Sequence, residues 1–127
     1  MRERLVRVCV VALGAIALVV GVAVDASADG ARRRGSCQGP GHWELRVARV
    51  SDHRLRVRFG VEGVRDGDTW QVFLSDDGVR IYARSRTSNG GDFRVRTLTR
   101  DRRGHDRIKA SAVDVDASGS CAGALRF

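Results

Sequence analysis

The chain has 127 residues, of which 30% are charged and 43% hydrophobic, and its formal net charge is +8 at neutral pH. This length allows one domain and excludes a multidomain enzyme. The basic balance favours acidic partners such as nucleic acid, an anionic cell-wall polymer or anionic lipid headgroups. Lys109 is the only lysine beside 22 arginines, a skew that a GC-rich genome also produces, so the charge alone does not identify a ligand.

The N-terminal segment has the three parts of a secretory signal. Met1 to Arg7 carries three arginines, residues 8–24 are apolar apart from glycines, and Ala26-Ser27-Ala28 places small residues where a signal peptidase cleaves. We therefore expect a signal-peptide helix within residues 1–28, cleavage after Ala28, and a secreted, extracellular mature protein with no stable membrane insertion. The alternative is an uncleaved anchor, since 17 apolar residues reach the lower end of what spans a bilayer.

Cleavage would leave two cysteines, Cys37 near the start of the mature chain and Cys121 near its end. An even pair in an exported chain of about 99 residues predicts a disulfide between them. A metal-binding thiol pair is disfavoured, because neither cysteine has a second Cys or His at ligand spacing.

Residues 29–41 are rich in charged and small side chains and predict a flexible lead-in, held only at Cys37. Residues 42–127 predict the folded domain. Its clearest strand is Arg54 to Glu62, where apolar residues alternate with arginines, so one face requires a core and the other faces water. Apolar alternation predicts about seven strands in all, with inward rows Trp43/Leu45/Val47, Leu55/Val57/Phe59/Val61, Trp70/Val72/Leu74, Ile81/Ala83, Phe93/Val95/Thr97, Ile108/Ala110/Ala112 and Cys121/Gly123/Leu125/Phe127.

Asp77-Gly78 has the composition of a two-residue hairpin turn. Such a turn pairs Leu74 with Ile81 and, on the opposite face, Phe73 with Tyr82. The sequence thus predicts that Phe73 and Tyr82 form an outward aromatic pair.

Short strands at this spacing predict an all-β fold, a two-sheet antiparallel sandwich. The order of features resembles an immunoglobulin-like domain, because Trp70 lies on the third strand and Gly104 to Ala110 looks like the turn and start of the sixth. Ala110 or Ala112 stands where antibody-type domains have their second cysteine, so the resemblance implies the layout and not antibody-like recognition. The chain is also similar to small uncharacterised secreted proteins of high-GC Gram-positive bacteria.

The sequence predicts no enzyme, no cofactor and no metal site. His42, His53 and His105 fall in predicted turns without partners at metal spacing. Asp114 to Gly119 resembles the opening of a calcium loop, but the twelfth position, which requires a carboxylate, is Leu125.

Two surfaces remain as candidate binding sites. In an immunoglobulin-like layout the strand at 54–62 lies beside the one at 92–99, which predicts one exposed face with five arginines: Arg54, Arg56, Arg58, Arg94 and Arg96. The expected partner of this face is an anionic polymer, with no specific nucleic acid. The alternative is a protein-interaction or inhibitor surface formed by Phe73 and Tyr82 that binds an extracellular protein. Either way, we expect a monomeric binding or structural module.

Overall fold

A computed structural model describes residues 25–27, 30–102 and 104–127. The predicted signal peptide lies outside these residues apart from 25–27. The described chain forms nine strands: β1 (Asp25–Ser27), β2 (Gly30–Ser36), β3 (His42–Ser51), β4 (Arg54–Glu62), β5 (Thr69–Asp76), β6 (Val79–Thr87), β7 (Asp92–Arg100), β8 (Arg107–Asp114) and β9 (Ser120–Arg126). No helix among the described residues is able to span a bilayer.

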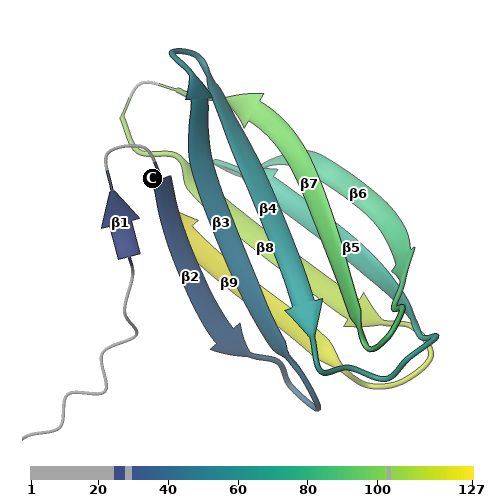
Figure 1. The fold of residues 1–127 in the computed structure, drawn as a ribbon. Helices are drawn as coiled ribbons and strands as arrows, with labels where there is room; N and C mark the ends of the chain where they lie inside the picture. The colour runs from purple at the N-terminus through teal and green to yellow at the C-terminus, as the bar shows by residue number, and fades with distance from the viewer. Residues whose placement is uncertain (1–24, 28–29, 103) are drawn as a thin grey trace, which may run out of the picture.

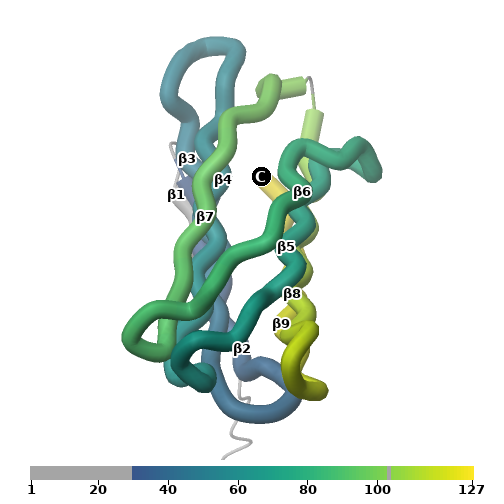
Figure 2. The backbone as a smooth tube through the Cα atoms, turned by 90° about the vertical axis from the view of Figure 1, so that its right-hand side faces the viewer, coloured from purple at the N-terminus to yellow at the C-terminus, as the bar shows by residue number. Residues whose placement is uncertain are grey.

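The strands form two antiparallel sheets, as the sequence predicts. The front sheet has the order β1-β2-β3-β4-β7 and the back sheet the order β6-β5-β8-β9 (Figure 1). Figure 2, turned by 90°, shows the sheets as two facing layers. From β3 onward the chain places two strands in front, two behind, one in front and two behind, a connectivity compatible with an immunoglobulin-like sandwich.

The core lies between the sheets and is made by the predicted inward rows. Leu55, Val57, Phe59 and Val61 of β4 are all fully buried, while the arginines between them point outward. Trp70 of β5 is 1% exposed and its ring centroid lies 5.5 Å from that of Phe93. The alternation predicted from sequence is therefore confirmed in both sheets except in β6, where the predicted inward residue Ala83 is exposed.

The sequence prediction of a flexible lead-in over 29–41 missed β2, which pairs with β3 along its whole length. Its inward residues are Ala31, Arg33 and Gly35, so no apolar alternation marks it. Gly35 lies so close to the indole of Trp43 that a Cβ there would be 2.5 Å from the ring. Arg33 donates from Nη1 to the carbonyl of Ala124 at 2.9 Å. The position of β2 therefore depends on its contacts with β3 and β9 and not on a hydrophobic alternation in its own sequence.

The predicted register of the β5–β6 hairpin is wrong beyond its turn. Asp77 and Gly78 both have positive φ, as the predicted two-residue turn requires. A β-bulge at Ile81 then shifts the pairing by one, so Leu74 faces Tyr82 and Phe73 faces Ala83. The bulge lets the consecutive apolar residues Ile81 and Tyr82 both pack against the core, which strict alternation forbids.

The predicted disulfide is present, since Cys37 and Cys121 are bonded. It joins the chain after β2 in the front sheet to β9 in the back sheet. Reciprocal backbone hydrogen bonds between Gln38 and Ser120, at 2.7 and 3.0 Å, lie directly beside it. On the opposite side of the sandwich, Thr97 of β7 contacts the carbonyl of Ile81 in β6. Both open sides of the sandwich are therefore bridged.

Candidate functional site

The outward face of the front sheet, which we call the arginine face, is the main candidate site. Because β4 pairs with β7, Arg58 lies directly opposite Arg96, and Arg94 lies opposite Gly60. Arg54 and Arg56 continue the row along β4. The five arginines that the sequence predicts on one face are thus brought together.

The structure adds arginines that sequence reasoning missed. Arg46 of β3 lies opposite Arg58 on its other side, and Arg32 of β2 lies opposite Arg46, which makes a row across four strands. Arg34 and Arg100 also point outward on this sheet. Arg46 was detectable from its alternation with Leu45 and Val47, whereas Arg32 and Arg34 lie in the segment that the sequence predicts as a flexible lead-in.

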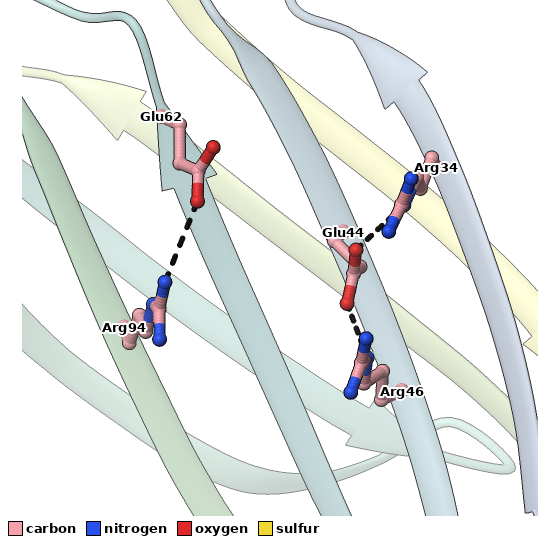
Figure 3. Close-up of polar contacts among 5 residues, drawn as sticks. All are labelled: Arg34, Glu44, Arg46, Glu62 and Arg94. Atoms are coloured by element: carbon pink, nitrogen blue, oxygen red, sulfur yellow. Dashed lines mark hydrogen bonds and ion pairs between the residues drawn. The ribbon is translucent and has the colours of Figure 1, made fainter.

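Two glutamates offset part of the positive charge (Figure 3). Glu44 lies between Arg34, whose Nε is 2.6 Å away, and Arg46, which is also hydrogen-bonded to it. Glu62 forms a longer pair with Arg94 at 3.4 Å. Partial burial alone would raise the pKa of Glu44, but the hydrogen bonds and charges of Arg34 and Arg46 lower it below its usual value. Glu44 is therefore an anion at neutral pH.

Four other arginines of the face have no acidic partner among the described residues. Arg54, Arg56, Arg58 and Arg96 form no ion pair there. Gly60 lies opposite Glu44 on one side and Arg94 on the other and has no side chain, so the surface dips at this point. The dip is lined by Arg34, Arg46, Arg58, Arg94 and Arg96. The arrangement offers several guanidinium groups to an anion that lies over the dip.

The alternative pair does not form one surface. Phe73 is on the outer face of the back sheet, with the guanidinium of Arg80 4.5 Å from its ring centroid. Tyr82 is turned to the core side by the bulge, and its hydroxyl accepts a hydrogen bond from Arg86 at 3.0 Å. Because the two rings face opposite ways, their predicted outward pairing is incorrect.

Two groups of three aspartates gather at the ends of the back sheet. In the first, Asp68, Asp114 and Asp116 each place a carboxylate oxygen within 4.8 Å of the others. Asp114 accepts the amides of Asp116 and Ala117, and Asp116 accepts that of Thr69. The carboxylates of the segment that resembles a calcium-loop opening therefore act mainly as turn-forming acceptors.

The second group contains Asp76, Asp77 and Asp106, again with carboxylate oxygens within 4.8 Å of one another. Burial and the neighbouring Asp76 and Asp101 together raise the pKa of Asp106 to about 7, while the hydrogen bond from the amide of Arg102 opposes this rise. Asp76 and Asp106 are 1% and 0% exposed. Asp77, in contrast, is exposed, so the group reaches the surface through this residue.

Neither aspartate group includes a histidine. His42 is at the end of the arginine face, His53 is in the β3–β4 turn, and His105 is in the loop before β8, and all three are exposed. No family model, no curated protein and no solved structure matches this chain.

Proposed function

We propose that the protein is a secreted, non-enzymatic binding module that holds an anionic polymer of the cell envelope on its arginine face. The observation that carries this proposal is the row of arginines that lie directly opposite one another across β3, β4 and β7. The Cys37–Cys121 disulfide supports an extracellular location, because such bonds persist in oxidising compartments. We also propose that the chain is related to small secreted proteins of high-GC Gram-positive bacteria.

The row is electrostatically unfavourable in the absence of a ligand. Like charges directly opposite each other in a sheet destabilise it, by roughly 0.2–1 kcal/mol per pair. Arg58 has such a neighbour on each side, Arg46 and Arg96, and Arg54 has Arg100. A polyanion that lies across the face would offset this repulsion. Its binding would therefore be favoured both by new ion pairs and by the reduced repulsion between the arginines.

The spacing of the guanidinium groups suits a repeating anion. Alternate residues on a strand are about 6.6 Å apart and neighbouring strands about 4.8 Å apart, so the arginines form a grid with those intervals. Guanidinium groups bind phosphate and sulfate bidentately. The grid therefore favours a polymer with closely spaced phosphate or sulfate groups, and it contains no base-reading element that would make nucleic acid a specific ligand.

The direct test is the triple change Arg54→Gln, Arg56→Gln and Arg58→Gln. We expect it to abolish salt-dependent retention on a heparin matrix while the melting temperature stays the same or rises, because the cross-strand repulsion is relieved. Elution from the matrix and thermal unfolding measure the two effects on the same samples.

The matched control removes three cations from the outer face of the back sheet. Arg107, Lys109 and Arg126 are exposed there, and changing all three to Gln gives the same net charge. We expect this control to keep most of its retention. If both triple variants lose retention equally, net charge alone explains the binding and the arginine face has no special role.

A single substitution should strengthen binding. Glu44→Gln removes the carboxylate that holds Arg34 and Arg46, so both guanidinium groups become free to contact a ligand. We expect this variant to elute from heparin at higher salt than the wild type. Asp52→Asn, at the exposed β3–β4 turn, adds the same charge without removing a partner of Arg34 or Arg46 and serves as its control. Equal shifts for the two variants would contradict a specific role for Arg34 and Arg46.

A further inference from the structure

The second aspartate group lies where three segments of the chain meet. Asp76 ends β5, Asp77 is in the turn to β6, and Asp106 directly precedes β8. Asp77 is anchored by Arg107, whose amide donates to the Asp77 carboxylate at 2.9 Å and whose carbonyl accepts the Asp77 amide at the same distance. Asp106 exchanges two backbone hydrogen bonds with Phe127. The positions of these carboxylates are thus fixed by the backbone.

Two of the carboxylates are buried with oxygens that have no partner. Oδ1 of Asp76 and Oδ1 of Asp106 have no hydrogen-bond donor, although both side chains are almost completely buried. Their other oxygens are bonded, that of Asp76 to Thr99 Oγ1 at 2.9 Å and that of Asp106 to the amide of Arg102 at 3.3 Å. A charged carboxylate oxygen that is buried without a partner destabilises the fold, so a positive occupant between these oxygens would stabilise it.

The distances fit a cation of calcium size. If three oxygens lie within 4.8 Å of one another, a single point exists that is no more than about 2.8 Å from each of them. Calcium binds carboxylate oxygens at about 2.3–2.6 Å, which needs only a slight contraction. Thr99 and Asp101 lie beside Asp76 and Asp106 respectively and bring two more oxygen-bearing side chains to the same place.

We propose that Asp76, Asp77 and Asp106 form a calcium site that fastens the β5–β6 turn to the start of β8. Calcium fits better than magnesium, because magnesium keeps several waters and the burial of Asp76 and Asp106 leaves little room for them. Asp77 is exposed, so the site opens to solvent on its side and admits the ion there. Extracellular modules commonly bind calcium with Kd values of about 0.1–1 mM, which suits a site with few ligands.

The first aspartate group does not support the same inference. Asp68 Oδ2 is the one buried oxygen of this group without a partner, and Asp114 and Asp116 each accept backbone amides. That group nevertheless supplies an ideal control. Asp116 is its exposed member and accepts one amide, from Thr69, just as Asp77 is the exposed member of the second group and accepts one amide, from Arg107.

The test is calorimetric titration of calcium chloride into chelator-treated protein, with thermal unfolding measured in parallel. We expect one bound ion and a rise in melting temperature of roughly 5–10 °C at ten times the Kd. Asp77→Asn keeps the acceptor for Arg107 but removes one ligand charge, and it should weaken binding on the order of tenfold. Asp116→Asn should bind calcium as the wild type does.

The alternative occupant is a proton shared between Asp76 and Asp106, and the same measurements distinguish it. If calcium neither binds nor raises the melting temperature, while acidification from pH 8 to 5 does raise it, the proton fills the group and the calcium proposal is overturned. Equal loss of binding in Asp77→Asn and Asp116→Asn would also overturn it. Because neither readout involves a polymer, the result is independent of the function proposed for the arginine face.

Discussion

Replacing Trp70 by alanine is expected to lower the free energy of unfolding by about 3–5 kcal/mol. Trp70 is among the largest fully buried side chains and packs against Phe93 from the facing sheet. Its removal would leave a cavity between two sheets that are closed on both sides, so the surroundings cannot collapse to fill it. Such a loss is a large part of a small domain's total stability. Urea unfolding followed by circular dichroism measures the change.

Two further variants separate the effect of volume from that of the side-chain type. Phe73→Ala on the outward face of the same strand should cost only about 1 kcal/mol, mostly from its contact with Arg80. Trp70→Phe should cost less than the lost volume suggests, because Trp70 Nε1 is buried without a hydrogen-bond acceptor. If Trp70→Ala cost no more than Phe73→Ala, Trp70 would not be a core residue.

Removing the disulfide by the double change Cys37→Ser and Cys121→Ser is expected to lower the free energy of unfolding by roughly 2–4 kcal/mol. The bond spans 84 positions, so it restricts most of the unfolded chain. The native junction should survive, because Gln38 and Ser120 hold the same two segments through their backbones. Chemical denaturation of the oxidised wild type and the double variant gives the difference.

Reduction of the wild type provides an independent measurement of the same quantity. The reduced protein should match the double serine variant within experimental error, since both lack only the cross-link. Titration of thiols in the natively exported protein checks the premise. Two free thiols in that sample would show that the bond does not form in the cell.

Most strands of the sandwich were predictable because each buries one face and exposes the other. β4 is the clearest case, with four apolar residues alternating with arginines and glycine. β2 was not predictable, because its inward positions are occupied by a glycine beside Trp43 and by an arginine that reaches the carbonyl of Ala124. The glycine makes room for the Trp43 ring, and an inward position without a large apolar side chain does not contribute to a hydrophobic alternation in the sequence.

The arginine face was partly predictable for the same reason. Arg54, Arg56 and Arg58 share a face by alternation alone, and an assumed strand order added Arg94 and Arg96. Arg32 and Arg34 entered only when β2 paired with β3. The misassigned register of β6 shows the opposite limit. A bulge changes the face of every later residue in the strand, so the alternation predicted from sequence fails beyond the bulge at Ile81.

The sequence by itself determined which residues face the core in six strands, the turn at Asp77 and the pairing of the two cysteines, because these follow from local alternation, local backbone preference and simple counting. The tertiary structure alone decided which acidic residues meet. Asp76 and Asp106 are 30 positions apart and neither belongs to a recognisable motif. They become neighbours because β5 and β8 pair side by side, and burial between the sheets then makes their unpartnered oxygens chemically significant.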